Sequence, residues 1–273
     1  MFLNQMKYYL IFFVLTALFF SCSPYQKALK SDDIGLKFHM ADSLYNVGQY
    51  KRALKLMEQI VPAYRGRPQA EKLMYIYSDT FYELGDYYLS GYQFERFSNS
   101  YPQSEKAEEA AFKGAKSFYH LSPRYSLEQK DTHTALEKLQ NFINKFPDSE
   151  YMAEANLLVS ELTNKLEKKE FEVAKQYYRL ADYNRDYNSA IKALDNFILD
   201  HPGSEFREEA FFLKFKAAYE LAVRSVAFRV EERLITSRGY YNLFLRNFPE
   251  SKFRPEAEEI KRDIDNRLEN KQV

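Results

Sequence analysis

The chain has 273 residues, of which 45% are hydrophobic and 39 are basic against 39 acidic. This composition is that of an ordered globular protein, and a formal charge of zero provides no general positive field for nucleic acid. The single cysteine excludes an internal disulfide and a metal cluster held by several cysteines.

The N-terminus predicts a secretory signal peptide. Lys7 precedes an apolar run over residues 8–20, and the small residue Ser21 separates that run from Cys22. At 1.5 Å per helical residue the run falls well short of the roughly 30 Å hydrocarbon core, so a permanent transmembrane helix is not expected. We predict a signal peptide over 1–21, cleaved between Ser21 and Cys22.

The end of this segment resembles the lipobox of bacterial lipoproteins. The resemblance implies a diacylglycerol on the Cys22 thiol and an N-acyl chain on the new N-terminus. Two or more chains, at about 0.8 kcal/mol per buried methylene, would anchor the protein stably. Ser23 is not the aspartate that retains some lipoproteins at the inner membrane, so the outer membrane is favoured. No acidic surface-export tag follows the cysteine, which favours the periplasmic face. The alternative is a plain secretory peptide with an incidental cysteine, which the position of the only cysteine disfavours.

A repeat marked by Phe, Pro and Ser occupies the rest of the chain. Four eight-residue segments align without gaps, and their prolines lie 45, 55 and 47 residues apart. A supersecondary unit recurring at this spacing predicts a helical solenoid. The segments are residues 97–104, 142–149, 197–204 and 244–251.

Each position of the repeat has a physical role. Residues 12, 8, 5 and 1 before the proline lie on one helical face, and the first of them is always Ser or Ala, which allows close helix approach. Proline ends the helix, and the serine two residues later is expected to cap the next one.

Two further units lie upstream. The spacing of Tyr45, Gly48 and Tyr50 matches that of Tyr82, Gly85 and Tyr87, and it resembles the turn of the tetratricopeptide repeat. We therefore predict an all-α, tetratricopeptide-type solenoid as one domain over 33–273, preceded by a lipidated tether over 22–32. Its repeats would span about 33–67, 68–104, 105–149, 150–204 and 205–252, with a capping helix at 254–270.

Two irregularities stand out. Residues 121–131 interrupt the third repeat and predict an extended turn on one edge. Residues 150–186 contain neither Gly nor Pro, which predicts one long helix whose exposed flank offers a docking surface.

No pattern typical of catalysis or metal binding is present. His39, His120, His133 and His201 fall in different repeats, and none has the i, i+4 pairing of a helical metal site. No phosphate-binding loop or nucleophile elbow occurs. Paired glutamates recur at equivalent repeat positions, which indicates solvated first turns. We therefore predict no catalytic residue, no metal and no cofactor other than the lipid on Cys22.

Tyrosines suggest where a ligand would bind. The first helices of a solenoid line its inner surface, and surplus tyrosines there would suit an extended peptide. The candidates are Tyr45, Tyr75, Tyr82 and Tyr119. Packing in the core is the competing interpretation for each of them.

The lipobox cysteine, the short tether and five repeats ending in Tyr/Phe-Pro-x-Ser resemble the BamD family of lipoproteins of the outer-membrane β-barrel assembly machine. Residues 171–178 and 231–258 carry the resemblance further, and the aromatic content would suit a member of this family from the Bacteroidota. The resemblance implies a non-enzymatic periplasmic scaffold. Its partners would be the POTRA domains of a BamA-like barrel protein, unfolded outer-membrane protein precursors and, through the anchor, membrane lipid.

Two other functions stay open. A CpoB-like periplasmic adaptor uses a similar Tyr-Pro-x-Ser ending, but that family is normally soluble with a coiled-coil N-terminus. A SusD-like glycan-binding lipoprotein shares the anchor and the helical repeats, but it is much longer and binds sugars on Trp platforms, whereas this chain has no Trp.

Overall fold

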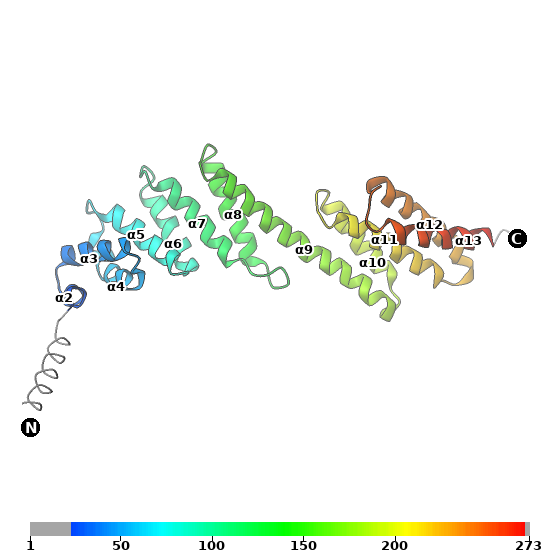
Figure 1. Ribbon diagram of the computed structural model, residues 1–273, viewed down its shortest axis with the longest axis horizontal. Helices are drawn as coiled ribbons and strands as arrows, with labels where there is room; N and C mark the ends of the chain where they lie inside the picture. The colour runs from blue at the N-terminus through cyan, green and yellow to red at the C-terminus, as the bar shows by residue number, and fades with distance from the viewer. Residues whose placement is uncertain (1–22, 271–273) are drawn as a thin grey trace, which may run out of the picture. The chain divides into compact units, whose positions relative to one another are not determined.

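The computed structural model describes residues 23–270 (Figure 1). Within this range the chain consists of α-helices and one short 3-10 helix, with no strand. Ser21, Cys22 and the rest of the predicted signal peptide lie outside the described residues. No helix of the described range is long and apolar enough to cross a membrane.

Two compact units make up the chain. The first contains residues 23–122 and 130–158, and the second contains 123–129 and 159–270. We expected one continuous domain over 33–273. The 33-residue helix α9 (Met152–Asn184) contributes residues to both units.

The first unit begins with a helix where the sequence suggested a tether. Ser23 caps α2 through the amide of Gln26, and Ala28 is fully buried against the following helices. Residues 24–30 are therefore part of the folded unit. Its helices are α2 (Pro24–Lys30), α3 (Ile34–Asn46), α4 (Tyr50–Ile60), η1 (Val61–Tyr64), α5 (Ala70–Glu83), α6 (Tyr87–Ser100), α7 (Ala107–Leu121) and α8 (Lys130–Lys145).

The second unit continues the same pattern. It contains the C-terminal part of α9, then α10 (Tyr187–Asp200), α11 (Arg207–Val223), α12 (Ala227–Asn247) and α13 (Arg254–Glu269). The pairs α3/α4, α5/α6, α7/α8, α9/α10 and α11/α12, closed by α13, confirm the predicted all-α solenoid of five repeats with a C-terminal capping helix. The predicted long helix is α9, and the predicted extended turn is the segment between α7 and α8.

The repeat positions are buried as their spacing requires. The small residues Ser90, Ala135, Ala190 and Ser237 are all 0% exposed. Phe94, Leu139, Leu194 and Tyr241, four positions later, are buried as well. Burial of such a large side chain stabilises the fold by about 1.5–3 kcal/mol, so these helix faces form the core.

The repeat serines do not have the predicted capping role. The Oγ atoms of Ser104, Ser149 and Ser251 accept from the amide two residues later, before the next helix begins. The same hydroxyls donate to Glu71, Glu108 and Glu208, at 2.6, 2.5 and 2.5 Å. Each of these serines therefore ties the end of one repeat to the first turn of that repeat's first helix.

Candidate functional site

Successive first helices meet at junctions that share a recurring pattern. In each first helix after α3, an acidic residue is followed four residues later by an aromatic ring, as in Glu108-x-x-x-Phe112. That ring faces the residue two positions after the repeat serine. Three junctions stack aromatic rings in this way, with centroids 4.7–5.3 Å apart and planes within 12°; the ring pairs are Phe112/Tyr151, Phe171/Phe206 and Phe212/Phe253.

A lysine–glutamate pair accompanies each of these stacks. A lysine four residues after the aromatic ring pairs with the glutamate five residues after the serine, in the next first helix. The pairs are Lys116–Glu154 at 2.6 Å, Lys216–Glu256 at 2.5 Å, and Lys175–Glu209. These junctions are therefore held by one stack and one partly exposed ion pair.

The junction between α5 and α7 departs from this pattern at two positions. Lys106 stands in the second aromatic position, with its Nζ 5.4 Å from the centroid of the Tyr75 ring. Asp79 stands in the lysine position, so the usual partner of Glu109 is missing. The first change replaces an aromatic ring with a charge, and the second reverses the sign of a charge.

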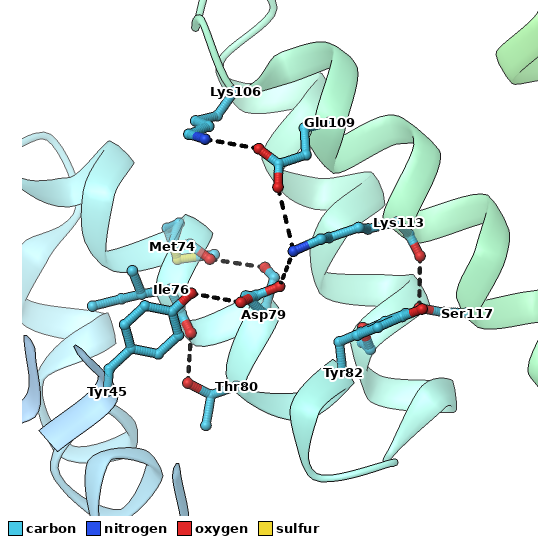
Figure 2. A network of polar contacts seen from close by, with 12 residues as sticks. Tyr45, Met74, Ile76, Asp79, Thr80, Tyr82, Lys106, Glu109, Lys113 and Ser117 are labelled. Carbon is cyan, nitrogen blue, oxygen red and sulfur yellow. Dashed lines mark hydrogen bonds and ion pairs between the residues drawn. The ribbon is translucent and has the colours of Figure 1, made fainter. Parts of the chain in front are cut away.

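Asp79 is the centre of the resulting network (Figure 2). Its carboxylate is only 4% exposed. It accepts from the Tyr45 hydroxyl of α3 at 2.5 Å and from the Lys113 Nζ of α7 at 2.6 Å. A buried charge is tolerated when it is paired and hydrogen-bonded in this way. Three first helices are thus joined through one carboxylate.

Glu109 forms the second half of the network. It receives Lys106 Nζ at 2.8 Å and Lys113 Nζ at 3.3 Å, and the Tyr75 hydroxyl also bonds to it. Burial alone would raise the pKa of Glu109. The hydrogen bonds from Lys106 and Tyr75 and the charge of Lys113 outweigh it and lower the pKa from 4.5 to about 2.

The tyrosines of this junction are held as neutral donors. Burial, and then the hydrogen bond to a carboxylate, raise the pKa of Tyr45 and of Tyr75 far above the usual value. Burial also raises the pKa of Tyr82, whose hydroxyl lies 3.3 Å from His120 Nε2. His120 in turn stacks on Tyr87, and burial followed by the nearby charge of Lys116 lowers the pKa of its imidazole.

Three of the four predicted groove tyrosines come together here. Tyr45 and Tyr75 belong to the network, and the Lys113 ammonium lies 5.9 Å from the rings of both Tyr75 and Tyr82. Tyr45, Tyr75 and Tyr82 are each only partly buried. Tyr119 lies on the same helix as Lys113, with its ring 5.5 Å from that of His120. Peptide binding by these tyrosines stays a prediction.

Sequence reasoning missed the charged residues between the tyrosines. Asp79, Lys106, Glu109 and Lys113 form the junction, and none was a candidate. A signal was available, because aligning the first helices puts Asp79 in a lysine position and Lys106 in an aromatic position. That alignment needs the registers of helices that the Pro/Ser pattern does not fix.

This face presents fixed hydrogen-bond donors and aromatic rings. Its carboxylates and lysines neutralise one another, and its phenols are committed to donating. In residues 23–270 no group of three or more His, Cys, Asp or Glu side chains is arranged to hold a metal ion.

Comparison with known families gives a match over most of the chain. The sequence model of the family YfiO, described as an outer membrane lipoprotein, matches residues 36–184 and 180–273. The comparison with curated proteins gave no match.

Solved structures with helical repeats are also similar. The TPR2AB-domain:pHSP90-complex of yeast Sti1 matches at 12% identity and a TM-score of 0.40, covering 85% of this chain and 98% of that one. A putative kinesin light chain of Podospora anserina with nearly identical TPR-like repeats matches at 12% identity and a TM-score of 0.32, covering 77% and 95%.

Proposed function

The chain belongs to the YfiO family of outer membrane lipoproteins, which is the BamD family, and from this premise we propose that it is a non-enzymatic scaffold of outer-membrane protein assembly. In this proposal it is anchored by a diacylglycerol and an N-acyl chain on Cys22 and lies on the periplasmic face. It binds the POTRA domains of a BamA-like barrel protein and unfolded β-barrel precursors.

The observation that carries the precursor-binding part is the departure of the α5–α7 junction from the other junctions. A junction that served only to stack helices would need no more than the ring stack and the partly exposed ion pair found elsewhere. This one instead places the buried Asp79 in the lysine position, and it sets two rings, those of Tyr75 and Tyr82, beside the Lys113 ammonium. Extended segments with alternating aromatic side chains suit such a surface, because their rings can pack against the rings of Tyr75 and Tyr82.

The anchor is tested by Cys22→Ala, which should move the protein from the membrane into the soluble fraction. Lipidation is refuted if the variant stays in the membrane. The assembly role is tested by extracting the tagged full chain in mild detergent and identifying its partners. A POTRA-bearing barrel protein should co-purify, and its repeated absence contradicts the proposal.

Precursor binding is tested with a fluorescent peptide that copies the C-terminal strand of an outer-membrane barrel. Tyr82→Ala should weaken its binding about tenfold, because a ring contact of this kind contributes on the order of 1–2 kcal/mol. Tyr183→Ala is the matched control, since Tyr183 is 92% exposed and lies in the other unit. Equal binding by both variants removes the α5–α7 face from the proposal.

A further inference from the structure

The first helices share a second recurring feature, which we call the stacking face. It comprises the residues two, five and six positions after the aromatic ring of each first helix. In α5, α7 and α11 these residues are mostly buried, and the middle one is 0% exposed in all three. The stacking faces are Tyr77, Thr80 and Phe81 in α5; Gly114, Ser117 and Phe118 in α7; and Lys214, Ala217 and Ala218 in α11.

A helix covers this face in each of these cases. Thr80 Oγ1 of α5 contacts Met57 Sδ of α4 at 3.9 Å. Ser117 Oγ of α7 donates to Ser90 Oγ of α6 at 3.0 Å. Ala217 of α11 packs in one cluster with Ala190 of α10. The second helix of the preceding repeat is therefore the normal occupant of a stacking face.

The stacking face of α9 is exposed to solvent. The aromatic ring of its pattern is Phe171, so the face consists of Val173, Gln176 and Tyr177. Val173 and Tyr177 are each 48% exposed, and Gln176 is exposed as well. Leu180, one turn further along the same side, is 47% exposed.

An insertion within α9 explains why its stacking face is exposed. In α7 and α11 the glutamate of the junction pair precedes the aromatic ring by three residues, whereas Glu154 precedes Phe171 by seventeen. The additional fourteen residues make nearly four helical turns and about 21 Å of rise. The second unit consequently begins with a complete first-helix pattern far along α9 from the point where the helix starts.

The loop between α7 and α8 forms one wall beside this face. A cavity of about 440 Å³ lies between α9 and the loop, lined by Tyr125 and Ser126 on the loop side and by Val173, Gln176 and Leu180 on the helix. Lys169 Nζ donates to the Leu127 carbonyl at 2.6 Å, and Lys168 Nζ lies 4.8 Å from the Tyr125 ring. The wall is thus fixed to the helix that it flanks.

Charge at the rim of the cavity favours an acidic occupant. Lys169 and Arg179 both line it, and the one carboxylate of the lining, Glu172, is already paired with Arg179 at 3.5 Å. The lining therefore carries one more cation than anion.

We propose that the stacking face of α9 binds an amphipathic α-helix of a partner protein. That helix carries small or apolar residues at i, i+4 and i+7 and acidic residues on the flank nearest Lys169. It takes the place that a preceding second helix takes on α5, α7 and α11. This proposal rests on the repeat geometry and does not depend on the assembly role.

The test uses photo-cross-linking in intact membranes. The photoreactive residue p-benzoyl-phenylalanine replaces Tyr177 in the full chain, and a second variant carries it at Tyr183 as the matched exposed control. The expected result is a cross-link at 177 and not at 183, mapped by mass spectrometry to an acid-flanked helix of one protein. A synthetic peptide of that helix should then compete for the cross-link.

A second experiment introduces a negative charge into the stacking face of α9. Val173→Asp in the 177 variant should lower the cross-link yield about tenfold, because an aspartate under an apolar helix is desolvated without a partner. Thermal unfolding of the chain alone should stay unchanged, since Val173 is half exposed.

Several results overturn the proposal. They are a cross-link to lipid, to a second copy of this chain or to a segment with strand periodicity, equal yields at 177 and 183, and no cross-link at all. Recovery of a POTRA-bearing barrel protein together with any of these would leave the proposed function standing while this inference fails.

Discussion

The α5–α7 junction of the first unit and the α11–α13 junction of the second occupy the same place in the repeat and are held by different forces. Phe212 stacks on Phe253 with the planes 5° apart, and Lys216 pairs with Glu256, which is 48% exposed. In the first unit, Lys106 covers Tyr75 and the buried Asp79 stands where the lysine would be.

The difference shows which part of the repeat can vary. The helix pairs, the repeat serines and the small buried residues are common to both regions, so the backbone geometry does not require the charged network. Burying Asp79 costs desolvation energy that Lys113 and Tyr45 only offset, whereas a ring stack stabilises outright. The α5–α7 junction is therefore a place where the chain forgoes packing energy, which is typical of a functional surface.

Removing an aromatic ring from the regular α11–α13 junction should have the largest effect on the free energy of unfolding. Phe212→Ala should lower the free energy of unfolding by about 3–5 kcal/mol, because Phe212 is 3% exposed and contacts both Phe244 and Phe253. Tyr75→Ala should cost clearly less, since Tyr75 is only partly buried. Denaturant titration of both variants measures the difference, and equal losses would show that the two junctions pack alike.

Lysine substitutions separate the two kinds of ion pair. Lys113→Met leaves the Asp79 carboxylate buried without its cation and should cost about 3 kcal/mol. Lys216→Met leaves the half-exposed Glu256 to water and should cost less than about 1 kcal/mol. Chemical denaturation of the two variants tests this order.

A double variant is the control for this pair. Adding Asp79→Leu to Lys113→Met removes the uncompensated charge together with its partner and should restore most of the lost stability. If the double variant is as unstable as the single one, lost packing and not charge explains the effect.

Much of the fold followed from sequence, because Pro/Ser punctuation and apolar spacing are local signals. The spacing of Ser90 and Phe94 predicted a buried helix face, and the stretch without Gly or Pro predicted α9. The role of Asp79 did not follow, since its meaning depends on Tyr45 and Lys113, each 34 residues away. Helix α2 was missed for a related reason, as Ala28 is buried only by packing against later helices.

Acid provides a graded test of the polar junction. The folded-state pKa of Glu109 is lowered from 4.5 to about 2, so its stabilising contribution is complete above about pH 4.5 and is lost as the pH falls toward 2. Glu109→Gln should flatten the decline of unfolding free energy in this window. Glu256→Gln is the matched control, because its half-exposed carboxylate pairs with Lys216 in a regular junction. An unchanged acid profile for Glu109→Gln would contradict the network.

The smallest expected effect concerns the turns of the two units. The turn between α5 and α6 places Gly85 at φ 77°, and the turn between α9 and α10 places Arg185 at φ 57° in the equivalent position, each just before an aspartate that caps the next helix. A residue with a Cβ is disfavoured in the left-handed region, whereas glycine adopts it freely. Arg185→Gly should therefore raise the free energy of unfolding by about 0.5–1 kcal/mol, a gain limited by the larger entropy of glycine in the unfolded chain. Gly85→Arg should lower it by at least as much. Thermal unfolding of both variants measures the two changes in stability. A loss of stability in Arg185→Gly would mean that contacts of the arginine side chain outweigh the strain of its backbone conformation.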